Sequence, residues 1–114
     1  SEEETKAAIG RVWQEQGYLM DTHTAVAWKV ACEQQGAAPT VVLSTASAYK
    51  FPTAVLEALQ VEGAADEFEQ MDQLFAITGT PIPENLKGLR SKTERHTGVI
   101  AKEKMLEFVL QQCK

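Results

Sequence analysis

Hydrophobic residues recur at helical spacing through most of the chain. This pattern predicts helices over residues 2–16, 66–77 and 102–112, each with one apolar face. A further helix is expected to begin at Pro52, because proline suits the first turn of a helix. Residues 25–32 are apolar on nearly every side, which is typical of a buried helix.

One segment departs from the helical period. Residues 40–45 form a continuous β-branched and apolar run that ends in hydroxyl residues, which is typical of a central parallel strand covered on both faces. Residues 97–100 are a weaker candidate strand. The predicted fold class is therefore α/β: a mostly helical α-β-α piece of a parallel-sheet domain, with one central strand at about residues 40–45 covered by helices.

A single strand leaves its backbone groups unpaired on both sides. We therefore expect that most of the sheet lies in chain outside these 114 residues. The chain begins at Ser1 without an initiator methionine, which agrees with the expectation that it is a piece of a longer chain. The alternative is self-association, in which the strand edge pairs with the same edge of another copy.

Composition narrows the class of protein. The formal net charge of -5 argues against a nucleic-acid or anionic-membrane partner, where a basic patch is expected. No apolar run approaches the roughly 20 residues that span a bilayer. The two cysteines, far apart in sequence, are interpreted as reduced thiols of a cytoplasmic protein. Neither they nor the two histidines have metal-ligand spacing, so no metal site is expected.

Several polar residues are candidates for chemistry. Ser44, Thr45 and Ser47 follow the predicted strand, and ligands of parallel α/β folds bind at the carboxyl ends of strands. His23, in the run Asp-Thr-His-Thr, could face an anion from a helix N-terminus. The simpler interpretations are local hydrogen bonds to the backbone for the hydroxyls and ordinary helix capping with an incidental histidine. Lys50 is expected to be solvated.

Two segments carry a family resemblance. One is Gly17–Ala27, with its Gly-Tyr and Asp-x-His-Thr-Ala-Val pattern, and the other is Leu43–Pro52, with Ser-Thr-Ala-Ser and Lys-Phe. In order and spacing they resemble the C-terminal part of threonine synthase, a pyridoxal-phosphate enzyme of the tryptophan-synthase-β fold group (fold type II). Thr22 and Ala48 stand where that family commonly has proline, and Ser47 stands where many members have histidine.

The resemblance implies a function for the full enzyme. It would convert O-phospho-L-homoserine and water to L-threonine and phosphate, a lyase reaction of threonine biosynthesis, with pyridoxal 5'-phosphate as cofactor. The motif places Thr45 at the cofactor's ring nitrogen, with Ser44 as the neighbouring candidate. It places His23, Thr24 and Ser47 near the substrate.

The same resemblance implies that parts of the active site lie outside these residues. The Schiff-base lysine and the loop that binds the cofactor phosphate belong to other parts of the family's chain, and Lys50 does not match the lysine's motif. We therefore expect no catalytic residue in these 114 residues and no activity from them alone.

The expected organisation is a single partial domain over 1–114, the C-terminal part of the large cofactor-binding domain. Residues 1–60 carry both motifs on a helix-helix-strand-helix order, and residues 64–114 form a C-terminal helical region. Two alternatives stay open: a stand-alone helical interaction or dimerisation module, and a fragment of another fold-type-II lyase.

Overall fold

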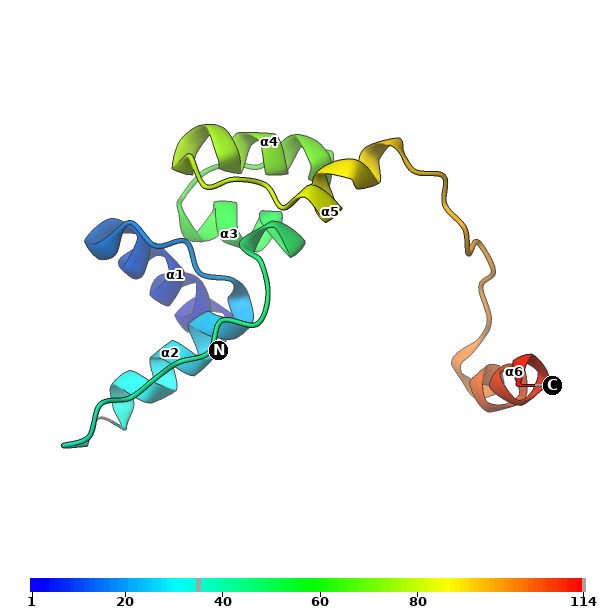
Figure 1. Ribbon diagram of the computed structural model, residues 1–114, viewed down its shortest axis with the longest axis horizontal. Helices are drawn as coiled ribbons and strands as arrows, with labels where there is room; N and C mark the ends of the chain where they lie inside the picture. The colour runs from blue at the N-terminus through cyan, green and yellow to red at the C-terminus, as the bar shows by residue number, and fades with distance from the viewer. Residues whose placement is uncertain (35, 114) are drawn as a thin grey trace.

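Helices account for all regular secondary structure in the computed structural model, which describes residues 1–34 and 36–113 (Figure 1). The longer helices are α1 (Glu2–Gln16), α2 (Thr22–Glu33), α3 (Pro52–Ala58), α4 (Glu67–Thr78) and α6 (Met105–Gln112). The short ones are η1 (Ala48–Lys50), α5 (Glu84–Lys87), η2 (Gly88–Ser91) and η3 (Lys102–Lys104). The helices predicted from periodicity are confirmed, with boundaries within a few residues.

The ends of α1 and α4 are set by local chemistry. Ser1 and Glu4 form a capping box at the start of α1, and Gly17 ends it in the left-handed conformation at φ 65°. Asp66 caps α4, and Gly79 ends that helix at φ 66°. These four signals stand in the sequence itself, which is why both helices could be located without a structure.

Four helices share the core. α1 packs on α2 and α3, and α3 packs on α4. A Cβ added at Gly10 of α1 would lie 2.7 Å from the backbone oxygen of Ala58, so the α1–α3 crossing needs glycine there. The buried apolar side chains of the core come from α1 to α4 and the links between them: Ile9, Val12, Met20, Ala25, Ala48, Tyr49, Val55, Leu56, Met71 and Leu74.

The predicted α/β fold class is wrong for this chain. Within residues 1–34 and 36–113 there is no strand and no sheet, and residues 40–45, the expected central strand, run extended without backbone hydrogen bonds. The physical reason is that a ladder needs a second strand, and no described segment supplies one. Val41 is 82% exposed and Leu43 is 73% exposed, so the run is not covered on both faces.

Two further expectations need correction. The weaker candidate strand at residues 97–100 is also irregular, and Val99 is 94% exposed. The segment 25–32 does form α2, but only part of it is buried, because Val26 and Val30 are about half exposed. The helix is apolar all round, yet the described chain covers one side of it.

The C-terminal residues extend away from the helices of the core. Residues 92–101 are irregular and lead to α6, which lies apart from α1–α5 at the far end of the molecule (Figure 1). The radius of gyration is 17.9 Å, whereas a compact domain of this length has about 13 Å. None of the helices described is long and apolar enough to cross a membrane.

Candidate functional site

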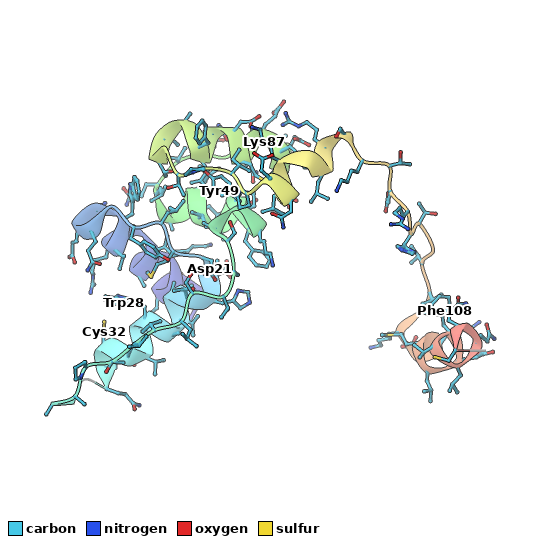
Figure 2. The ribbon with its side chains drawn as sticks, viewed as in Figure 1. Asp21, Trp28, Cys32, Tyr49, Lys87 and Phe108 are labelled. Atoms are coloured by element: carbon cyan, nitrogen blue, oxygen red, sulfur yellow. The ribbon has the colours of Figure 1, made fainter. Side chains whose placement is uncertain are left out.

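Asp21 organises the first of the two motif segments. Its carboxylate accepts hydrogen bonds from the backbone N–H groups of His23, at 2.9 Å, and Thr24, at 3.1 Å, and from the Thr24 hydroxyl. Asp21 is 1% exposed and Thr24 is buried beside it. Asp21, labelled in Figure 2, is therefore the N-cap of α2. Its other oxygen is occupied by the Thr24 side chain of the same turn.

The hydrogen bonds decide the charge state of Asp21. Burial of the carboxylate acts to raise its pKa, but the hydrogen bonds from the Thr24 hydroxyl and from the two backbone N–H groups favour the ionised form. These bonds prevail, so the pKa of Asp21 lies below its ordinary value of 3.8. The carboxylate is ionised at neutral pH and stabilises the positive end of the α2 dipole.

His23 projects outward from this capped turn. Its side chain is 67% exposed, and Nδ1 lies 3.7 Å from the Asp21 carboxylate oxygen Oδ1. The imidazole ring lies 5.6 Å from the ring of Phe51, measured between centroids. Phe51 belongs to the second motif segment, so His23 brings the two segments into contact.

A groove of about 450 Å³ opens at this contact. His23 and Val26 of α2 line one side, Phe51 and Ala54 line another, and Lys6 of α1 lies among the remaining lining residues. The Lys6 ammonium group is paired with the carboxylates of Glu2, at 2.9 Å, and Glu57, at 2.6 Å. The positive charge in the groove is therefore already neutralised by the protein.

Ser47 and Tyr49 fix the second motif segment. The Ser47 hydroxyl accepts a hydrogen bond from the backbone N–H of Tyr49, at 3.3 Å, and so caps η1. Tyr49 is 3% exposed, and its hydroxyl donates to the backbone oxygen of Thr80, which ties this segment to the link after α4 (Figure 2). Burial raises the pKa of Tyr49, so its hydroxyl remains a donor at neutral pH.

Ser44 and Thr45 differ from the other candidates. Both are exposed on the extended run, and neither forms a hydrogen bond within the described part of the chain. None of the hydrogen bonds described joins them to His23, Thr24 or Ser47. Their hydroxyls are free donors of the kind that a pyridine nitrogen accepts, so they fit a ring contact with pyridoxal phosphate. The roles predicted for all five residues stay predictions.

The remaining candidates have ordinary surroundings. Lys50 is exposed at the end of η1. Cys32 and Cys113 are exposed free thiols. Across residues 1–34 and 36–113, no group of three or more His, Cys, Asp or Glu side chains could hold a metal ion.

Sequence reasoning missed two features of the site. It did not single out Asp21 as the cap of α2, although Asp is among the preferred N-cap residues and Asp21 stands directly before this helix. It also missed the contact between His23 and Phe51, for which no local signal exists, because the two residues meet only through the packing of α2 and the turn before α3.

A comparison with known families covers most of the two motif segments. The model of the family described as "Threonine synthase, C-terminal" matches residues 24–109, which is most of the chain. The chain belongs to the threonine synthase C-terminal family. The resemblance stated from the two motifs is therefore confirmed.

Individual relatives match a shorter part of the chain. Threonine synthase-like 1 of Macaca fascicularis is 43% identical over 63 residues, which are 54% of this chain and 8% of the relative. Threonine synthase-like 1 of Homo sapiens is 41% identical over the same length and coverage. The matched segment thus spans less than a tenth of the length of these relatives.

Proposed function

We propose that this chain is the C-terminal portion of a threonine synthase that converts O-phospho-L-homoserine and water to L-threonine and phosphate. The observation that carries the proposal is the family match over residues 24–109. It is supported by the placement of both motif segments on one groove, where His23 meets Phe51. The proposed setting is the cytoplasm.

We assign the contact with the ring nitrogen of pyridoxal phosphate to Thr45, with Ser44 as the neighbouring candidate. When bound, the cofactor supplies an electron sink for the substrate. A threonine hydroxyl orients the ring nitrogen as a neutral donor or acceptor, and it adds no negative charge that would keep this nitrogen protonated. The exposed Thr45 hydroxyl, without a partner among the described residues, supports this role.

His23 and Ser47 are proposed to lie near the substrate. His23 has an exposed ring at a groove, which supports contact with a small molecule. The Ser47 hydroxyl caps η1 and can still donate its proton outward. The Thr24 hydroxyl already donates to Asp21 inside the protein, so its contribution is proposed to be indirect, through the start of α2.

We further propose that catalysis needs residues outside this chain. A lysine that forms a covalent bond to the cofactor is activated by a lowered pKa. Lys6 and Lys29 instead lie in ion pairs with carboxylates, and these pairs raise the pKa of both lysines. Lys50, the lysine in the second motif, is exposed at the end of η1.

The test is Thr45→Val in an enzyme of full family length that carries this segment. The substitution keeps the shape of the side chain and removes the hydroxyl. We expect kcat to fall by about fivefold, because one lost hydrogen bond is worth about 1 kcal/mol, while bound cofactor measured by absorbance stays stoichiometric. Thr40→Val, in the same extended run, is the matched control and should retain activity. Equal activity of the two variants would remove Thr45 from the site.

A further inference from the structure

A buried tyrosine joins the second motif segment to the far end of α4. Tyr49 stands four positions after Thr45, and its side chain is 3% exposed. Its hydroxyl donates a hydrogen bond to the backbone oxygen of Thr80, and the two partners are 31 positions apart in the sequence. A bond between residues so distant in the chain does not arise from local geometry. The Tyr49–Thr80 bond therefore fixes where η1 lies relative to the end of α4.

The acceptor side of this bond is itself held in place. The Thr78 hydroxyl donates to the backbone oxygen of Leu74, at 2.7 Å, and accepts a hydrogen bond from the backbone N–H of Thr80, at 3.2 Å. Both bonds belong to the turn in which α4 ends at Gly79. The Thr80 carbonyl is therefore positioned by the last turn of a core helix.

The hydroxyl of Tyr49 is not needed to fill the core. The residue belongs to a buried cluster that also contains Val55 of α3 and Met71 and Leu74 of α4. Phenylalanine would contribute nearly the same apolar surface there without a polar group that needs a buried partner. The hydroxyl therefore contributes the bond to Thr80 rather than packing.

The segment before Tyr49 depends on η1 for its position. Residues 40–45 form no backbone hydrogen bonds within the described part of the chain. The next bonds along the chain lie in η1, where the Ser47 hydroxyl accepts from the N–H of Tyr49, at 3.3 Å, and the Ser47 backbone oxygen accepts from the N–H of Lys50, at 3.0 Å. A shift of η1 would therefore carry the exposed hydroxyl of Thr45 with it.

We propose that Tyr49 is a positioning residue, whose bond to Thr80 holds η1 at the end of α4 and thereby places the Thr45 hydroxyl for the ring of pyridoxal phosphate. The inference rests on the proposed function, because it uses the contact assigned to Thr45. Tyr49 is buried and its hydroxyl is already bonded, so it acts through Thr45 and does not touch the cofactor. Binding groups need to be held within about 0.5 Å of their productive geometry, which an extended run without such a bond does not ensure.

Amide hydrogen exchange in the 114-residue chain, without cofactor, tests the structural part of the inference. Tyr49→Phe keeps the ring and removes the donor. The backbone amides of Lys50 and Phe51, both bonded within or next to η1, should exchange about fivefold faster, because the loss of one hydrogen bond lets η1 open locally. Thr78→Val loosens the acceptor side and should change the same two amides in the same direction, by a smaller factor.

Asp66→Ala is the matched control for these two variants. It removes the cap at the other end of α4 and lowers stability by a similar amount, so it shows what a general loss of stability does to exchange. The amides of Lys50 and Phe51 should keep their exchange rates in this variant. Unchanged exchange in Tyr49→Phe, or equal acceleration in Asp66→Ala, would overturn the inference.

Kinetics in an enzyme of full family length test the positioning role. In Tyr49→Phe, kcat should fall by about threefold, less than in Thr45→Val, because the Thr45 hydroxyl is displaced but not removed. Bound cofactor, measured by absorbance, should stay stoichiometric. The double variant should be no slower than Thr45→Val alone, because Tyr49 has no hydroxyl left to position once Thr45 is replaced. Asp66→Ala should retain kcat.

The double variant also separates this inference from the proposed function. If Thr45→Val lowered kcat while Tyr49→Phe had no effect, or if the two losses multiplied, the positioning role would be overturned and the contact of Thr45 with the cofactor would stand. Full activity of Thr45→Val would overturn the cofactor contact and this inference with it.

Discussion

The two motif segments satisfy their polar groups in opposite ways. At Asp21–Thr24 the carboxylate, two backbone N–H groups and a hydroxyl are joined in one buried cluster. At Ser44 and Thr45 the hydroxyls are exposed and unbonded within the described residues. Two stretches with similar hydroxyl content therefore serve different purposes: the first holds the fold together, and the second is free to bind something else.

This contrast separates the stabilising residues from those available for function. A buried polar cluster is costly to break, because each group that loses its partner remains without water. An exposed hydroxyl loses nothing, because water replaces its partner. Substitutions at Asp21 and Thr24 should therefore reduce stability, whereas substitutions at Ser44 and Thr45 should affect only the activity of an enzyme that contains the segment.

The largest expected effect comes from Asp21→Ala. It removes the N-cap of α2 and leaves the buried Thr24 hydroxyl without an acceptor. Loss of the cap and of the buried partner together should lower the free energy of unfolding by about 2–4 kcal/mol, measured by urea denaturation with helical circular dichroism.

Asp66→Ala is the matched control for that substitution. Asp66 caps α4 through the same two kinds of backbone bond, at 3.0 Å each to Phe68 and Glu69, but these bonds are exposed. Its loss should cost about 1 kcal/mol. Equal costs at Asp21 and Asp66 would contradict the claim that burial distinguishes the first segment.

Thr24→Val should have the next largest effect. The substitution keeps the shape of the side chain but removes the donor to the Asp21 carboxylate. A hydrogen bond to a charged group contributes about 1.5–3 kcal/mol, and the denaturation midpoint should fall accordingly. Thr24→Ser retains the hydroxyl and should recover most of the loss. If Thr24→Ser and Thr24→Val were equally destabilising, the methyl group would contribute as much as the hydroxyl, which would contradict the special importance of the hydrogen bond to Asp21.

The pH dependence of stability gives a smaller effect with a definite sign. The pKa of Asp21 is lower in the folded chain than its ordinary value of 3.8, so the folded state holds the ionised form more strongly than the unfolded state does. The resulting stability is present above pH 3.8 and is lost as the pH falls through the folded pKa. In Asp21→Asn this part of the acid dependence should disappear. If Asp21→Asn left the slope of unfolding free energy against pH unchanged between 2 and 5 (roughly the titration range of carboxyl groups), the predicted contribution of Asp21 to acid stability would be contradicted.

The sequence predicted the features that depend on neighbours along the chain. The apolar period and the caps at Ser1 and Gly17 locate α1, because a helix makes its hydrogen bonds within itself. The extended run at Val41 could not be resolved in the same way. Its β-branched residues indicate a strand, but strand pairing needs a second segment, and none is present among the described residues.

In the candidate site, too, local features were predictable from the sequence and long-range contacts were not. The Asp21 cap is a local feature with a sequence signal, and the hydroxyls of Ser44 and Thr45 were located by the motif. The contact of His23 with Phe51 arises only when α2 packs near the start of α3, so the sequence alone does not predict it. The sequence also did not predict that one side of α2 is exposed. An all-apolar pattern predicts a buried helix, but it does not show which other segment covers each side.

The smallest expected effect is at the second segment. Ser44→Ala and Thr45→Val should each change the free energy of unfolding of this chain by no more than about 0.5 kcal/mol, because the hydroxyls are exposed and have no described partner. Tyr49→Phe is the internal comparison, since it removes a buried hydroxyl that donates to Thr80 and should cost about 1 kcal/mol. A loss at Thr45 as large as that at Tyr49 would mean that the Thr45 hydroxyl already has a partner in the folded chain. It would then be unavailable to a cofactor ring, and the difference between the two motif segments would vanish.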